Sequence, residues 1–205
     1  MGGDAFIVAG AVLVGLCFGS FLNVCILRLP HDQSLLRPRS TCPQCKQPIA
    51  WRDNIPVVSW LWLRGKCRWC RKPISARYPL VEAASGLLAA GLQLRRPDLP
   101  GWGAVAALAC FVLVVVALID WDTFLIPDEL SLGLAFSGIL FSPINPHFDA
   151  GGGWWLGALW SARGALVGLA MGWGLAVVGE FVFKKEALGG GDVKLLAGVG
   201  AWTGM

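Results

Sequence analysis

Long apolar runs separated by short polar links are the strongest constraint on the fold of this 205-residue chain. Hydrophobic residues make up 56% of the chain and charged residues 15%, and the mean hydropathy is +0.62. About 20 mostly apolar residues are needed to cross roughly 30 Å of hydrocarbon. Several runs meet or approach that length, which excludes an ordinary soluble domain. We therefore predict an all-α, polytopic transmembrane helical bundle.

The apolar runs predict six spans, and no internal repeat is evident in the chain. The predicted spans are 5–27, 79–94, 101–119, 126–141, a fifth within 154–183 that starts after Arg163, and a sixth that starts near Val193. Only 13 residues follow Asp192, so we expect the last helix to be incomplete at the C-terminus. The expected domains are a first span over 1–27, a loop over 28–78 and a membrane domain over 79–205.

Four cysteines in the loop 28–78 have the spacing of a metal site. They form two Cys-x-x-Cys pairs with 21 residues between the pairs: Cys42, Cys45, Cys67 and Cys70. Two such turns complete a tetrahedral zinc shell. A catalytic zinc needs an open coordination position, which four cysteines do not leave. The spacing therefore predicts structural Zn²⁺, with transient disulfides as the alternative.

The same loop is strongly basic. It holds 11 of the 17 Lys and Arg residues and two acids, Asp32 and Asp53, which gives it a net charge of +9. Cationic loops stay on the cytoplasmic side during insertion, and that reducing compartment favours zinc over disulfides. We expect the loop to contact the anionic surface of the lipid bilayer. It matches no nucleic-acid-binding motif, so we expect no nucleic-acid partner.

Two aspartates lie at the ends of apolar runs. Asp120 ends the third run, and Asp192 follows the glycines Gly189–Gly191. Carboxylates beside hydrocarbon are costly and indicate function. Two neighbouring carboxylates can share one proton, so that one draws a proton from water while the other protonates the leaving amide nitrogen. This is aspartic peptidase chemistry; the alternative is that both residues are interfacial turn or cap residues.

Other residues near these aspartates have more ordinary interpretations. Pro127 lacks an amide proton and should interrupt the helix. We expect the consecutive glycines before Asp192 to take backbone conformations closed to other residues and to let a substrate strand approach. Capping or head-group contact is the favoured reading for Asp122, Asp128 and Glu129. Asn23 should make an interhelical hydrogen bond, whereas Glu82 could do the same or support the active site.

Taken together, these motifs resemble those of type IV prepilin peptidases, membrane aspartic enzymes that process pilins and the pseudopilins of type II secretion. The matching elements, in order, are Gly19–Val24 leading to Arg28-Leu29-Pro30, the two cysteine pairs, Arg77–Glu82, Asp120 with Ile126-Pro127-Asp128, and Gly189–Asp192 followed by Lys194. The resemblance covers nearly the whole chain.

The resemblance implies Asp120 and Asp192 as the catalytic pair, with Asp122 as the fallback for the first member. The resemblance also assigns supporting roles in the two aspartate motifs to Gly189, Gly191, Pro127 and Lys194. It also implies cleavage of a basic prepilin leader after a glycine, and methylation of the new N-terminus with S-adenosyl-L-methionine. The expected location is the bacterial inner membrane, with the active site at the cytoplasmic face. No residues can be assigned to the methyl-donor site. The alternatives are a peptidase without methyl transfer and a non-enzymatic zinc-loop adaptor for pilus or secretion assembly.

Overall fold

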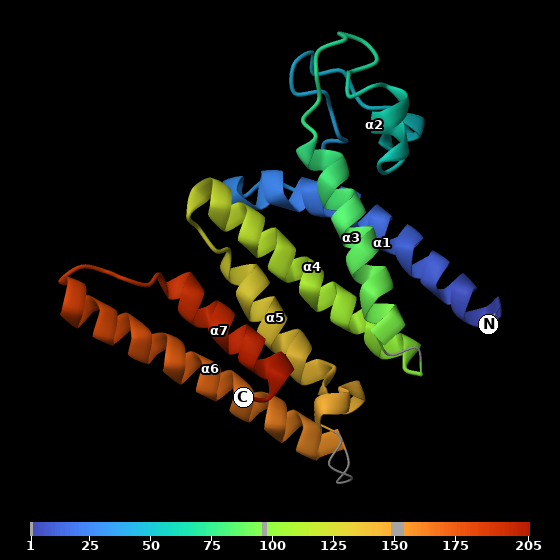
Figure 1. The fold of residues 1–205 in the computed structure, drawn as a ribbon. Helices are drawn as coiled ribbons and strands as arrows, with labels where there is room; N and C mark the ends of the chain where they lie inside the picture. The colour runs from blue at the N-terminus through green and yellow to red at the C-terminus, as the bar shows by residue number, and fades with distance from the viewer. Residues whose placement is uncertain (1, 96–97, 149–153) are drawn as a thin grey trace. The chain divides into compact units, whose positions relative to one another are not determined.

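A computed structural model describes residues 2–95, 98–148 and 154–205, and the regular elements within them are all helices (Figure 1). The prediction of an all-α chain is confirmed. The chain divides into two compact units, Met1–Leu118 and Ile119–Met205. The predicted loop 28–78 lies between α1 (Gly2–Arg28) and α3 (Arg77–Arg95). Its assignment as a separate domain stays a prediction.

The first unit is organised around the contact between α1 and α3 (Figure 1). Small residues let the two backbones touch. A Cβ atom on Gly15 would lie 2.6 Å from the carbonyl oxygen of Ser85, and one on Gly19 would lie 2.6 Å from Cα of Glu82. Glycine is therefore required at both positions, as in other closely packed membrane helices.

The loop between α1 and α3 is mostly irregular. Its helical segments are short: η1 (Leu29–His31), η2 (Trp51–Asn54) and α2 (Val58–Trp62). With so little regular structure, the loop depends on side-chain contacts for its shape. The unit also contains most of α4 (Pro100–Thr123).

In the second unit, α7 (Gly190–Thr203) packs against both α5 (Asp128–Leu140) and α6 (Trp154–Phe183) (Figure 1). One face of α6 buries only small residues: Gly157, Ser161, Gly164, Gly168 and Gly172. A Cβ atom on Gly164 would lie 2.2 Å from the carbonyl oxygen of Gly200. The contact between α6 and α7 is therefore made backbone to backbone.

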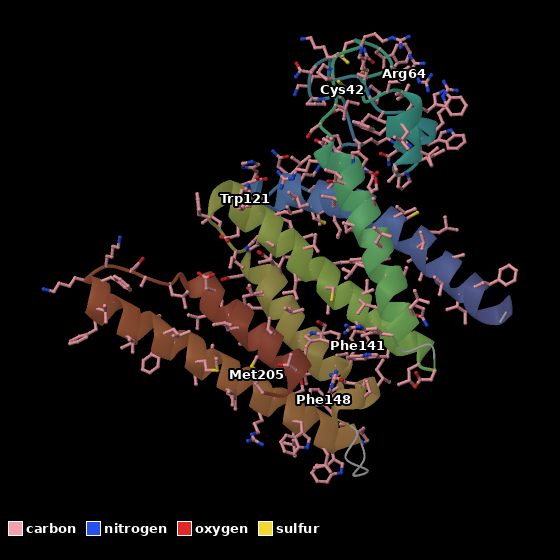
Figure 2. All side chains as sticks on the ribbon, viewed as in Figure 1. Cys42, Arg64, Trp121, Phe141, Phe148 and Met205 are labelled. Carbon is pink, nitrogen blue, oxygen red and sulfur yellow. The ribbon has the colours of Figure 1, made fainter. Side chains whose placement is uncertain are left out.

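The short turns η3 (Ser142–Ile144) and η4 (Pro146–Phe148) follow α5. The sequence predicted that prolines would end this helix near Phe141, and it ends at Leu140. In Figure 2, Phe141 and Phe148 mark this region. A Cβ atom on Gly204, just after α7, would lie 2.3 Å from the ring of Phe148, so these turns pack against the end of α7.

Three helical segments in the described part of the chain are long and apolar enough to cross a membrane: Ala5–His31, Gly101–Thr123 and Trp154–Phe183. The other three predicted spans also form helices, α3, α5 and α7, but they do not reach that length and hydropathy. For example, α5 has 13 residues, which is about 20 Å against the roughly 30 Å of a bilayer core. The other three crossings, by α3, α5 and α7, stay a prediction.

Two helices begin before the predicted starts of the fifth and sixth spans. α6 begins at Trp154 rather than after Arg163, because Arg163 lies within the helix and its guanidinium covers the ring of Trp160 at 5.0 Å. α7 begins at Gly190 rather than near Val193, so two of the three glycines form its first turn. The sequence interpretation treated Arg163 as a boundary of the fifth span. It treated the glycines before Asp192 as a break before the sixth.

Candidate functional site: a four-cysteine loop and two aspartate motifs

The thiols of Cys42, Cys45, Cys67 and Cys70 converge. Their four Sγ atoms all lie within 4.8 Å of one another. The Sγ atoms of Cys42 and Cys70 are 3.9 Å apart, and those of Cys45 and Cys67 are 4.0 Å apart. In a tetrahedral zinc site with Zn–S bonds of about 2.3 Å, adjacent sulfurs are about 3.8 Å apart. The four thiols therefore fit a zinc ion closely, and Cys42 is where the cluster lies in Figure 2.

The two halves of this cluster are built in the same way. The N–H of Cys42 donates to the carbonyl of Gln47, and the N–H of Cys67 donates to the carbonyl of Lys72, both at 2.9 Å. Lys46 and Arg71, one in each half, both have φ of 59°. Each half is thus a tight turn that presents its first and fourth residues to one centre.

These turns are an internal repeat that sequence reasoning missed. The segments Cys-Pro-Gln-Cys-Lys-Gln-Pro-Ile (42–49) and Cys-Arg-Trp-Cys-Arg-Lys-Pro-Ile (67–74) share both cysteines, a cation after the second cysteine, and a final Pro-Ile. In each, an isolated β-bridge pairs the proline with the residue before the first cysteine. Aligning the two cysteine pairs by their flanking residues would have revealed it.

The positive charge around the cysteine cluster matches the negative charge of a zinc ion bound by four thiolates. Four thiolates around one Zn²⁺ leave a net charge of about −2. Cations flank the cysteines in both turns: Lys46, Lys66, Arg68, Arg71 and Lys72. The backbone N–H of Cys45, which donates to the sulfur of Cys42, is the main reason that the pKa of Cys42 is lowered to about 6. At Cys42 both features favour the thiolate form that binds metal.

An ion pair braces the second turn. The guanidinium of Arg68 binds the carboxylate of Asp53 with two hydrogen bonds, one of them from Nε to Oδ2 at 2.7 Å. The hydrogen bond from Arg68 is the main cause that lowers the pKa of Asp53. Asp53 is one of only two acids in the loop 28–78, and it holds the segment before α2 to the second turn.

Asp120 lies exposed on the last turn of α4. The helix ends because Phe124 takes a left-handed conformation with φ of 54°, and its N–H donates to the carbonyl of Asp120 at 2.8 Å. Trp121 is 82% exposed and Phe124 87% exposed, and Figure 2 marks Trp121 at this end of α4. Large exposed aromatic side chains next to a carboxylate are typical of a membrane interface.

A short link leads from this turn into α5. Pro127 precedes α5 with φ of −60° and ψ of 130°, so it interrupts the helix as the sequence predicted. Asp128 makes no capping hydrogen bond with its side chain. Instead, its Oδ2 pairs with Nζ of Lys194 in α7 at 2.6 Å. The capping interpretation of Asp128 was therefore wrong, because a cation from a distant motif reaches it.

Asp192 lies in the first turn of α7 and is partly buried. Its Oδ2 accepts a hydrogen bond from the backbone N–H of Gly189 at 3.1 Å. This bond satisfies one of the free N–H groups at a helix start, and a carboxylate here also suits the helix dipole. In this conformation Asp192 holds its own glycine motif in place.

The reason for the glycines differs from the sequence prediction. None of the glycines 189–191 has a positive φ, and Gly189 is extended at φ of −70° and ψ of 154°. The requirement at Gly191 is steric: a Cβ atom there would lie 2.8 Å from Cβ of Ile126. The expectation of unusual backbone conformations was therefore wrong, and close approach between two segments replaces it.

The two aspartate motifs are therefore in contact through their neighbours. Gly191, next to Asp192, touches Ile126 in the link that follows Asp120, and Lys194 pairs with Asp128. Within the described residues, no hydrogen bond joins the carboxylates of Asp120 and Asp192 to each other. A shared proton stays a prediction.

Asn23 joins α1 to α3, and Glu82 joins α3 to the loop. Nδ2 of Asn23 in α1 donates to the carbonyl of Tyr78 in α3 at 3.1 Å, the interhelical hydrogen bond that the sequence indicated. Oε2 of Glu82 accepts the backbone N–H of Val57 at 2.7 Å. Sequence reasoning missed this second contact, because nothing in the pattern pairs residue 82 with residue 57.

Comparison with known proteins covers almost the whole chain. Residues 13–95 match the family model for the bacterial peptidase A24 N-terminal domain, and residues 107–205 match the type IV leader peptidase family. A prepilin leader peptidase/N-methyltransferase of Aeromonas hydrophila is 42% identical, over 94% of this chain and 71% of the relative. The protein of that description from Klebsiella pneumoniae is 43% identical, over 94% of this chain and 83% of the relative.

A third relative carries a different description. The type 4 prepilin-like proteins leader peptide-processing enzyme of Escherichia coli O78:H11 is 37% identical, over 95% of this chain and 76% of the relative. No solved structure matches the chain. The two family models and the relatives agree: this chain belongs to the type IV leader peptidase family of membrane enzymes.

Proposed function

We propose that this protein is a membrane aspartic endopeptidase that cleaves the basic leader of type IV prepilins and type II secretion pseudopilins after a glycine. The substrate class follows the descriptions of its relatives. Asp120 and Asp192 are the proposed catalytic pair. The contact of Gly191 with Ile126 supports this most directly, because it brings the segment before Asp192 to the link that follows Asp120.

In the proposed reaction one ionised carboxylate removes a proton from water, and the resulting hydroxide attacks the scissile carbonyl. The carbon–nitrogen bond then breaks as the second carboxyl, which holds a proton, delivers it to the leaving nitrogen. Two neighbouring carboxylates suit this division of labour because they resist simultaneous ionisation. The Gly189 N–H keeps Asp192 in place before substrate arrives.

The proposed location is the bacterial inner membrane, with the reaction at its cytoplasmic face. The +9 charge of the loop 28–78 supports a cytoplasmic position for that loop. The exposed Trp121 and Phe124 support a position for Asp120 at the membrane interface rather than within hydrocarbon. A prepilin whose basic leader stays in the cytoplasm would present its cleavage site at this level.

We further propose that Zn²⁺ is held by Cys42, Cys45, Cys67 and Cys70 as a structural ion. The loop 28–78 has few helical residues, so metal binding would supply much of its folding free energy. We also propose that the enzyme methylates the new N-terminus with S-adenosyl-L-methionine, as the descriptions of relatives include N-methyltransferase. The methyl donor supplies the methyl group to the amine exposed by cleavage.

The peptidase proposal is tested by replacing each aspartate singly with asparagine. Asp120→Asn and Asp192→Asn should each lower leader cleavage by about 10³-fold or more, since each removes a group needed for proton transfer. Membrane insertion and zinc content should stay unchanged. Cleavage is measured on a purified prepilin reconstituted with the enzyme in detergent.

Two further variants complete this test. Glu129→Gln, at an exposed acid in the first turn of α5, is the matched control and should cleave normally. Asp122→Asn distinguishes the two candidates for the first catalytic member. Normal cleavage by both Asp120→Asn and Asp192→Asn would eliminate the peptidase assignment. Mass spectrometry of the processed pilin separates a peptidase with methyl transfer from one without, because only the former adds the mass of a methyl group.

A further inference from the structure

A cavity of about 450 Å³ lies inside the first unit, between the helices α1 and α3 and the loop that carries the four cysteines. Its walls come from the end of α1, the start of α3, and the loop residues around the cysteine turns. Cavities of about 300–1,000 Å³ are typical of small-molecule sites. The two aspartate motifs do not line it, and the peptidase reaction makes no use of it.

We infer that this cavity is the binding site of the adenosyl methyl donor, a molecule with a net positive charge that carries a sulfonium, an ammonium and a carboxylate at one end. The inference rests on the proposed N-methyltransferase activity and adds the place where the donor binds. It is carried by the charge, shape and anchoring of the cavity's own residues.

Glu82 supplies a buried carboxyl group. Its side chain lines the cavity, and the residue is only 9% exposed. Within the described residues, no lysine or arginine forms an ion pair with this carboxylate. A buried carboxylate without a cation is costly, so a cationic ligand at this position would be strongly favoured. A sulfonium or an ammonium group meets that need.

The loop holds Glu82 in position through a strained turn. The N–H of Val58 donates to the carbonyl of Pro56 at 2.6 Å, which forces Val57 into φ of 61° and ψ of −50°. A positive φ is rare for a β-branched residue, and such strain concentrates at ligand sites. The turn directs the N–H of Val57 to Oε2 of Glu82 at 2.7 Å.

The remaining polar groups fit the other parts of the donor. Asn23 uses both hydrogens of its amide on the carbonyls of Gly19 and Tyr78, so its oxygen is oriented as an acceptor for a hydroxyl or an amine. Lys46 and Lys66, which are exposed, line the cavity toward solvent and suit a carboxylate. The carboxyl group of Glu82 thus lies deep in the cavity, whereas the side-chain ammonium groups of Lys46 and Lys66 lie at its rim.

The apolar surface of the cavity suits a flat ring system. Leu27, Leu63 and Trp60 line it, and Trp60 is fixed by a hydrogen bond from Nε1 to the carbonyl of Ile74 at 3.1 Å. Ile49 and Ile74 each end one cysteine turn and also line the cavity. Metal binding therefore shapes the cavity wall, which predicts that loss of zinc also weakens donor binding.

Direct binding to the full-length chain in detergent tests the inference, with isothermal titration calorimetry as the readout. The wild-type protein should bind one S-adenosyl-L-methionine, and more tightly than its neutral thioether product. Glu82→Gln keeps the size of the side chain and an acceptor for Val57 but loses the charge. It should weaken donor binding by about tenfold or more and remove the preference for the charged donor over the product.

A second pair of variants tests the cavity without altering charge. Leu27→Trp adds bulk at the cavity wall, whereas Leu13→Trp makes the same change at a more exposed site on α1 outside it. Only the first should reduce binding. Zinc content is measured for every variant, because a retained ion shows that the loop is folded.

The outcomes separate this inference from the proposed function. If Glu82→Gln and Leu27→Trp keep zinc and bind the donor like the wild type, the site lies elsewhere and the inference is overturned, although methylation stands. If the wild type cleaves leader but binds no donor, the inference and the methylation proposal both fall, and the peptidase remains.

Discussion

Nζ of Lys194 lies 2.6 Å from Oδ2 of Asp128, so one ion pair joins two motifs that are 66 residues apart in the sequence. It links the start of α5 to the first turn of α7, next to the contact of Gly191 with Ile126. The proposed catalytic aspartates flank this junction on either side. The pair therefore acts on their relative positions, and its effects should be visible in activity more than in stability.

The first prediction concerns this pair. Lys194→Met and Asp128→Asn should each lower leader cleavage about two- to fivefold, because an exposed ion pair contributes no more than about 1 kcal/mol. The double variant should be no worse than either single variant, since each already breaks the pair. Cleavage rates in a double-mutant cycle measure this. Lys185→Met, at an exposed lysine after α6, is the control, and multiplicative losses would show that the two residues act independently.

The second prediction concerns the glycine motif. Gly191→Ala should lower cleavage by about tenfold or more, because its methyl group would collide with Ile126 and separate the two motifs. Gly190→Ala is the matched control, since a Cβ atom there meets nothing within 4 Å. Both proteins are assayed for cleavage and thermal unfolding. Equal activities would mean that the contact with Ile126 plays no part.

The third prediction concerns the metal. The wild-type chain should contain one zinc ion, whereas Cys42→Ser should lose it and leave the loop 28–78 open to trypsin, which has many cleavage sites there. Cys17→Ser, at an exposed cysteine outside the cluster, should keep the ion. Atomic emission gives the zinc content and limited digestion gives the state of the loop. A zinc-free Cys42→Ser protein that resists trypsin would argue against a structural ion.

The fourth prediction concerns the brace between Asp53 and Arg68. Asp53→Asn should speed the release of zinc to a chelator, because the second turn loses its anchor. The pKa of Asp53 is lowered in the folded protein, so its contribution is fully present above the ordinary value of about 3.9 and is lost only as the pH falls below it. The ratio of release rates between the variant and wild type should therefore be constant from about pH 5 to pH 8. A ratio that changes within that window would contradict the assignment.

The fifth prediction concerns the contact between α6 and α7. Gly164→Ala should lower the unfolding temperature, because its methyl group would overlap the carbonyl of Gly200. Gly174→Ala on the same helix has open space around it and should be neutral or stabilising, since alanine favours helix by up to about 1 kcal/mol. Thermal unfolding in detergent compares the two. Equal destabilisation would point to loss of glycine flexibility rather than to helix contact.

The sequence predicted the helical fold and the positions of most helices because apolar runs and prolines are local signals. Three of its six predicted spans, those at α3, α5 and α7, stay predictions, because the helices there are too short or too polar for length and hydropathy to decide whether they cross the bilayer. α6 begins before the predicted start of the fifth span, because Arg163 does not interrupt the helix and its side chain lies over Trp160.

In the candidate sites too, local sequence patterns indicated some features, whereas others depend on tertiary structure. The convergence of the four cysteines was predictable from spacing, and the repeat behind it was readable but overlooked. The pairing of Lys194 with Asp128 and of Glu82 with Val57 depends on tertiary structure, so no local pattern contains it. The role of Gly191 was misread because sequence shows that a side chain is absent but not which neighbour requires its absence.

The glycines of α1 fix what can move around the inferred donor cavity. Since the backbones at Gly15 and Gly19 already touch α3, those two walls cannot slide or part without breaking their packing. Entry and exit of a small molecule would therefore take place past the exposed lysines at the rim of the cavity rather than between α1 and α3. The zinc ion would then stiffen the loop 28–78 on one side of the cavity, whereas α1 and α3 form a rigid wall on the other.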